Sequence, residues 1–136
     1  MLPQKKIEES VEYWILNSRE KLETMRELYN RKRYADSLYY GHMILEMVLK
    51  AMVVQKSRKP APHIHNLSRL VELSEADLGE REMDLLAKVN RFNLESRYPN
   101  EKLEFYKICT KSFADGFYEA ISNLYKKLCQ KAKLKK

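Results

Sequence analysis

The chain has 136 residues, 33% of them charged, and a formal net charge of +7. This length suits one domain with its own core, and the positive excess favours acidic partners such as nucleic acid, nucleotides or an acidic protein. No run of 18 apolar residues is present and no apolar stretch of signal-peptide length follows the start, so we expect a cytoplasmic protein that does not span a membrane.

Two long helices are predicted first. Between Ile7 and Tyr29, apolar residues recur every three or four positions, as on one face of a helix. A polar link at 30–33 precedes a second predicted helix over about Tyr34–Ser57. Its apolar residues occupy two faces, so we expect this helix to be central and contacted on several sides.

The second half of the chain is predicted to hold shorter helices and one long one. The prolines of 58–63 predict a loop, and Leu67, Leu70 and Val71 then predict a short helix before a polar turn at 74–79. A further helix covers about 83–92, and a last one begins somewhere between 101 and 109 and ends near Gln130. With 3 glycines, 4 prolines and no period-two alternation, no strand is predicted.

The predicted architecture is all-α. We expect an antiparallel up-and-down helical bundle of four main helices plus one short helix. The bundle forms one domain over residues 1–136, and a basic C-terminal tail covers about 131–136.

A polar stripe lies along the second predicted helix. His42, Glu46 and Lys50 are spaced by four residues among apolar neighbours, and a Glu followed by Lys at this spacing forms a favourable pair. A carboxylate on a buried face needs such partners. Two interpretations remain open: a structural network at the bundle surface, or the supporting polar wall of a ligand cleft.

No metal or cofactor is predicted. His63 and His65 are two positions apart with no third ligand near them in sequence, and His65 with Asn66 better suits the start of a helix. Cys109 and Cys129 have no CxxC neighbour and are expected to be reduced. Since the glycines are too scattered to form a phosphate loop, any phosphate must be bound by side chains.

Side chains suited to phosphate binding are concentrated where an apolar helical pattern ends, in the segment 90–99. Arg91 and Arg97 can fork onto phosphate oxygens, Tyr98 can stack on a base, and Asn93 offers a polar contact. Pro99 stops the helical path. The alternative interpretation is a solvated helix end followed by a turn.

Several motifs in this order resemble the HEPN family of small helical domains. The motifs are Trp14, Tyr34-Ala35-Asp36-Ser37-Leu38, Leu45-Glu46-Met47-Val48-Leu49-Lys50-Ala51-Met52, His65-Asn66-Leu67, and Asn93 through Arg97-Tyr98-Pro99. The resemblance covers nearly the whole chain. It implies a homodimer in which polar residues of both subunits face a shared cleft. Many family members are ribonucleases with an Arg-x(4–6)-His motif, and others pair with a minimal nucleotidyltransferase as toxin and antitoxin.

The sequence departs from the family at the motif histidine. Counted from Arg91, the corresponding positions hold Ser96, Arg97 and Tyr98, and an arginine does not shuttle protons as an imidazole does. No catalytic residue is therefore assigned. We expect a dimeric nucleotide- or RNA-binding domain, with a minimal nucleotidyltransferase as its implied partner. The alternatives are a ribonuclease toxin with an altered motif and a non-catalytic helical interaction module.

Overall fold

The computed structural model describes residues 1–133, and within that range it is all-helical without β-strands. The α-helices are α1 Gln4–Asn30, α2 Tyr34–Ser57, α3 Leu67–Ser74, α4 Glu80–Val89, α5 Pro99–Ile108 and α6 Lys111–Lys133. Two short 3-10 turns, η1 Asn90–Phe92 and η2 Leu94–Ser96, connect α4 to α5. The predicted all-α class is therefore confirmed. Lys133 is the last helical residue described, so positions 134–136 of the predicted basic tail lie outside the described residues.

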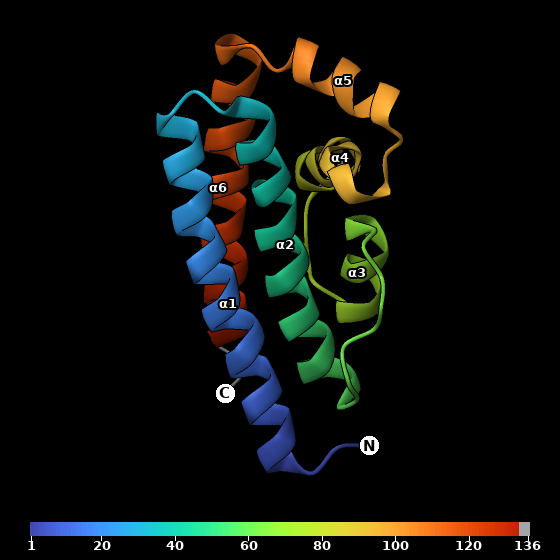
Figure 1. The fold of residues 1–136 in the computed structure, drawn as a ribbon. Coiled ribbons are helices and arrows are strands. Elements are labelled where there is room, and N and C mark those ends of the chain that lie inside the picture. Colours follow the sequence, from blue (N-terminus) through green and yellow to red (C-terminus); the bar gives the residue numbers. More distant parts are fainter. Residues whose placement is uncertain (134–136) are drawn as a thin grey trace.

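The three long helices form the body of the molecule, with α2 in its centre (Figure 1). Fourteen residues of α2 are buried. By length and composition α2 is apolar enough to cross a membrane, but 72% of its most apolar window is buried inside the protein, as the central helix of a core requires. The shorter helices α3 and α4 pack on the side of α2 away from α1 (Figure 1).

The helix arrangement differs from the predicted four main helices plus one short helix. In Figure 1, α1 and α2 are antiparallel, whereas α6 runs in the same direction as α2. This is possible because α3, α4 and α5 carry the chain back to the end of the bundle where α2 begins. There, α5 lies above α4 and leads into the start of α6 (Figure 1).

The last helix, predicted to begin somewhere between 101 and 109 and to end near Gln130, begins at Lys111, and the residues before it form a separate helix, α5. Cys109 leaves the helical conformation with φ −80° and ψ 67°, and the Thr110 hydroxyl then accepts a hydrogen bond from the Phe113 N–H at 3.3 Å, as a helix N-cap does. The three-four spacing was misleading because Leu103 and Tyr106 are 57% and 48% exposed. Instead, Phe105 and Cys109 anchor this region in the core.

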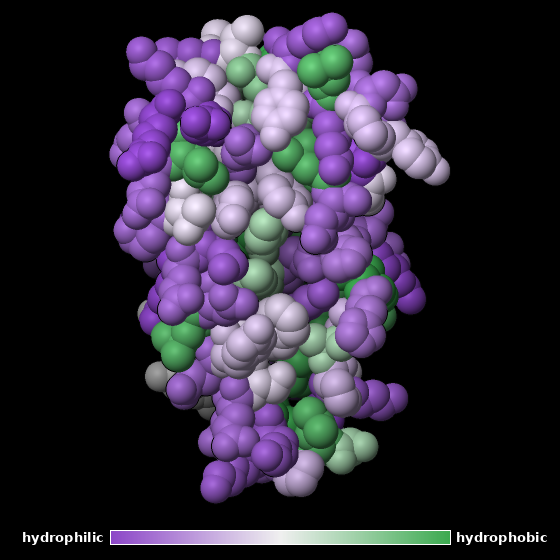
Figure 2. Space-filling view, viewed as in Figure 1, coloured by the Kyte–Doolittle hydropathy of each residue, from purple (hydrophilic) through white to green (hydrophobic). Residues whose placement is uncertain are grey.

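Close contacts fix α2 against its neighbours. A Cβ on Gly41 would lie 2.9 Å from Cδ1 of the buried Ile121, so glycine permits the close approach of α2 and α6. The Ser37 hydroxyl of α2 donates to the Met25 carbonyl of α1 at 2.9 Å. The face shown in Figure 2 is mostly hydrophilic, with pale and green side chains between the purple ones.

Candidate functional site

The segment 90–98 is an anchored turn between α4 and α5. Phe92 is 3% exposed and Leu94 7%, and the Phe92 ring lies 5.2 Å from that of Phe105 and 5.0 Å from that of Phe117, measured between centroids. Arg91, by contrast, is exposed. The apolar anchors therefore hold the backbone in place while Arg91 extends into solvent.

Asn90 ties the start of this segment to α3. Its Oδ1 accepts a hydrogen bond from the Leu67 N–H at 2.7 Å, and its Nδ2 lies 3.5 Å from the Ser68 hydroxyl. Asn66 caps the same helix by accepting from the Arg69 N–H at 3.0 Å. The unsatisfied N–H groups at the start of α3 thus position the turn that carries Arg91.

The structure brings Arg91, Arg97 and Tyr98 together in one corner. Arg97 Nη2 donates to the Arg91 carbonyl at 3.2 Å, and its Nη1 lies 3.5 Å from Glu101 Oε2. Glu101 Oε1 in turn accepts from the Tyr98 N–H at 3.0 Å. Tyr98 is 75% exposed. Within residues 1–133, the Arg91 side chain has no hydrogen bond or ion pair, so its guanidinium is available to a ligand.

Asn93 is placed differently from the other three predicted ligand residues. It is only 8% exposed, and its carbonyl accepts a hydrogen bond from the Ser96 hydroxyl at 3.0 Å. This bond closes η2. The position of Asn93 suits a residue that shapes the turn, and it offers a ligand less surface than Arg91 or Tyr98.

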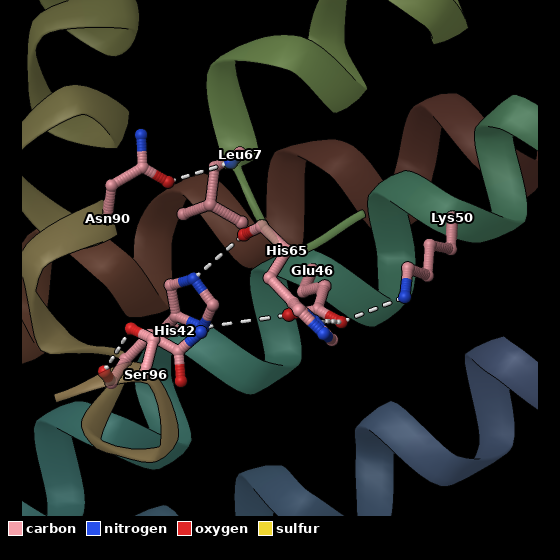
Figure 3. A network of polar contacts seen from close by, with 8 residues as sticks. His42, Glu46, Lys50, His65, Leu67, Asn90 and Ser96 are labelled. Carbon is pink, nitrogen blue, oxygen red and sulfur yellow. Dashed lines mark hydrogen bonds and ion pairs between the residues drawn. The ribbon is translucent and has the colours of Figure 1, made fainter. Parts of the chain in front are cut away.

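The predicted polar stripe forms a connected network with Glu46 at its centre (Figure 3). Glu46 Oε2 accepts from Lys50 Nζ at 2.9 Å and from His65 Nδ1 at 3.0 Å, and Oε1 lies 3.7 Å from His42 Nδ1. His42 and Lys50 are 1% and 6% exposed, Glu46 is 14% exposed and His65 60%. Lys50 Nζ also lies 5.4 Å from the centre of the Trp14 ring, within cation–π range.

His42 joins the network as a neutral donor. Burial lowers the pKa of His42 below its ordinary value, and this effect is larger than the opposing effect of the Glu46 charge. His42 Nε2 lies 3.1 Å from the His65 carbonyl, which only accepts, so Nε2 carries the proton. This bond fastens the 58–66 loop to α2.

Other groups offer less to a ligand or a reaction. Among the residues described, no three His, Cys, Asp or Glu side chains are grouped to hold a metal ion. Burial raises the pKa of Cys109 to about 12, so its thiol stays protonated and unreactive. Two open hollows of about 350 and 360 Å³ lie between α4 and α6, around Arg81, Leu85 and Ala120, and neither is lined by the segment 90–98.

Sequence reasoning missed the contributions of three residues to this region, namely His65, Glu101 and Asn90. His65 was expected to order the start of α3, whereas its ring binds Glu46 and Asn66 provides the cap. Glu101 holds Arg97 and the Tyr98 N–H, and the spacing of Tyr98 and Glu101 as first and fourth residues of a helix start was a usable signal. Asn90 gave no such signal, because its partner Leu67 is 23 positions away.

Comparison with known proteins gives one result. A family model described as the HEPN domain matches residues 11–132, nearly the whole chain. Neither the curated proteins nor the solved structures contain a match.

Proposed function

Because the chain belongs to the HEPN domain family, whose function is related to nucleotides or RNA, we propose that it binds a nucleotide or an RNA strand. The proposed binding residues are Arg91, Arg97 and Tyr98. Asn93 shapes the turn that carries these residues. The wall formed by His42, Glu46 and Lys50 supports the turn from behind.

The observation that carries this proposal is the contact of Arg97 Nη2 with the Arg91 carbonyl at 3.2 Å, next to a Tyr98 ring that is 75% exposed. Two guanidinium groups and an aromatic ring thus lie in one short turn. Guanidinium groups suit phosphate oxygens, and a tyrosine ring suits a base. The 3.5 Å pair of Arg97 with the exposed Glu101 is a weak competitor, so a phosphate can replace it.

The proposal includes assembly with other chains. We propose a cytoplasmic homodimer in which the segments 90–98 of both copies face a shared cleft, and a minimal nucleotidyltransferase as toxin–antitoxin partner. The support is membership of the family together with the net charge of +7, which suits a shared phosphate site. Sedimentation velocity tests the dimer, and co-purification with a co-expressed minimal nucleotidyltransferase tests the partner.

The binding site is tested by fluorescence anisotropy with a labelled single-stranded RNA and by calorimetry with AMP. Arg97→Ala removes a charged donor, so we expect RNA binding to be about tenfold weaker or more. The salt slope, which is the slope of log affinity against log salt concentration, should be lower in magnitude by about 0.7. Arg69→Ala is the matched control, because Arg69 forms a comparable exposed pair with Glu72 at 3.0 Å on α3. Equal affinities of wild type and Arg97→Ala, with unchanged circular dichroism, would contradict the site.

A ribonuclease is the second candidate, and one observation favours it. His65 donates from Nδ1 to Glu46 Oε2 at 3.0 Å while its ring is 60% exposed. The neutral ring then presents the lone pair of Nε2, and a carboxylate-oriented imidazole of this kind is a general base. RNA degradation in EDTA that is lost in His65→Ala, with RNA binding retained, would support this candidate. RNA that stays intact in the same assay would rule out the ribonuclease and leave RNA binding as the remaining function.

A pure interaction module makes a different prediction from both. A ligand that binds only the native state raises the melting temperature. Absence of any shift with AMP or RNA at saturating concentration would favour the interaction module over the binding function.

A further inference from the structure

Exposed apolar side chains concentrate on α5 and its first turn. Seven large apolar or aromatic side chains are exposed among the residues described, and four of them lie within 98–108. These are Tyr98, Leu103, Tyr106 and Ile108, with exposed fractions of 75%, 57%, 48% and 52%. Such a concentration on one short helix of a charged protein indicates an interaction surface.

The helix α5 connects the segment 90–98 to the turn between α1 and α2. It lies above α4 at the end of the bundle where α2 begins, and its last turn leads into the start of α6 (Figure 1). The Tyr106 hydroxyl donates to Oδ1 of Asp36, in the first turn of α2, at 2.8 Å. This bond raises the pKa of Tyr106, and the nearby positive charge of Arg33 opposes that effect.

The α1–α2 turn carries a run of cations that the protein itself does not neutralise. Arg31, Lys32 and Arg33 are exposed, and within residues 1–133 none of their side chains has a hydrogen bond or ion pair. Three carboxylates near this end have other partners: Asp36 with Tyr106, Glu101 with Arg97, and Glu104 with Lys107 at 3.6 Å. The end of the bundle thus attracts a polyanion.

We propose that α5 and the α1–α2 turn extend the phosphate site into a track for single-stranded RNA, so that the ligand is a strand of several nucleotides. The track runs from Arg97 and Tyr98 past Tyr106 to Arg31, Lys32 and Arg33. The ten residues of α5 span about 15 Å. Aromatic rings that stack on bases, together with cations that meet the backbone, are the usual composition of single-strand sites.

This inference rests on the proposed function and makes it more specific. A single nucleotide would need only Arg91, Arg97 and Tyr98, and would leave the three turn cations unused. A second copy of the chain fits the far part of the track, at the α1–α2 turn, poorly, because it would bring another run of three cations against this one. The hydrogen bond to Asp36 restrains the Tyr106 ring before a ligand arrives, which lowers the entropy cost of stacking.

The experiment compares ligand lengths and charge variants. Binding of AMP is measured by calorimetry, and binding of single-stranded oligouridylates of increasing length by anisotropy. We expect affinity to rise more than tenfold with length before reaching a plateau. The variant Arg31→Gln/Lys32→Gln/Arg33→Gln should lose most of that gain and lower the salt slope by about 2, at about 0.7 for each lost phosphate contact. Its affinity for AMP should not change.

Two further variants make the test specific. Lys5→Gln/Lys6→Gln/Lys59→Gln removes the same charge from exposed positions at the opposite end of the bundle (Figure 1), and should bind long RNA like the wild type. Tyr106→Ala should weaken long RNA by about tenfold, whereas Tyr106→Phe keeps the ring and should weaken it less. Melting curves of every variant verify the fold.

The outcomes separate this inference from the function on which it rests. Long RNA that binds no tighter than AMP, or a turn variant that binds long RNA like the wild type, overturns the track and leaves the phosphate site intact. Absence of binding to AMP and to every RNA overturns both. A turn or Tyr106 variant that abolishes self-association in sedimentation but not RNA binding assigns the surface to protein contact and overturns the track.

Discussion

Replacing Glu46 with alanine is the sharpest test of the polar network that supports the site. Lys50 Nζ lies 2.9 Å from Glu46 Oε2 in a position where the Lys50 side chain is 6% exposed. The Trp14 ring at 5.4 Å is the remaining neighbour described for this ammonium. Glu46→Ala therefore leaves a buried positive charge without its carboxylate.

The expected cost follows from the burial of the pair. Removing one partner of a buried ion pair costs about 3–5 kcal/mol. Glu46 itself is 14% exposed and water can enter the space that alanine leaves, so we expect the lower end, about 3 kcal/mol in the free energy of unfolding. For a chain of this length the melting temperature should fall by about 10 °C. His65 loses its partner as well, so RNA binding should also weaken.

Urea unfolding followed by circular dichroism measures the change, and two variants provide the controls. Glu46→Leu/Lys50→Met replaces both charges with apolar groups and should regain most of the lost stability. Glu9→Ala breaks the exposed pair of Lys6 and Glu9, 3.5 Å apart, and should change stability little. A Glu46→Ala protein within about 1 kcal/mol of wild type, or a double variant no more stable than the single one, would refute the reasoning.

Three further predictions concern the scaffold. Because burial lowers the pKa of His42 below 6.5, the unfolded chain takes up the proton first as pH falls. Neutral His42 therefore makes its full contribution to the free energy of unfolding above about pH 6.5, and this contribution is lost as the pH falls below that value. A pH series of urea midpoints should show this loss, and His42→Gln should reduce it. Gly41→Ala places a Cβ 2.9 Å from Ile121 Cδ1 in a fully buried contact, so we expect a net destabilisation of about 1 kcal/mol, relieved by Ile121→Val; a more stable Gly41→Ala protein would contradict this packing. Asn66→Ala removes the cap on the Arg69 N–H and should cost about 1 kcal/mol in urea unfolding, whereas an unchanged midpoint would mean that the cap contributes nothing.

The long helices could be predicted because their signal is local. Apolar spacing predicted α2, and the polar link at 30–33 and the prolines of 58–63 predicted its bounds, Tyr34–Ser57. The spacing is clear because a central helix is apolar on most of its surface. The break between α5 and α6 could not be found in this way. Leu103 and Tyr106 keep the helical spacing although they face solvent, and the cap at Thr110 is one weak polar residue within a continuous pattern.

The site was predicted in part for the same reason. Four-residue spacing predicted that His42, Glu46 and Lys50 share one helix face, and in the structure Glu46 lies 2.9 Å from Lys50 Nζ and 3.7 Å from His42 Nδ1. His65 reaches Glu46 from 19 positions away, a distance that no local pattern spans. The buried position of Asn93 depends on the anchoring of its neighbours Phe92 and Leu94, which is a property of the packed core.

Cross-linking tests the central claim most directly. Single-stranded RNA that contains 4-thiouridine is bound to the wild-type protein and irradiated, and the cross-linked peptides are identified by mass spectrometry. We predict cross-links at Tyr98 and in the peptides of the segment 90–98, with further ones at Tyr106 for longer strands, all suppressed in Arg97→Ala. Cross-links confined to the hollows between α4 and α6, around Arg81 and Leu85, or unchanged by Arg97→Ala, would contradict the account.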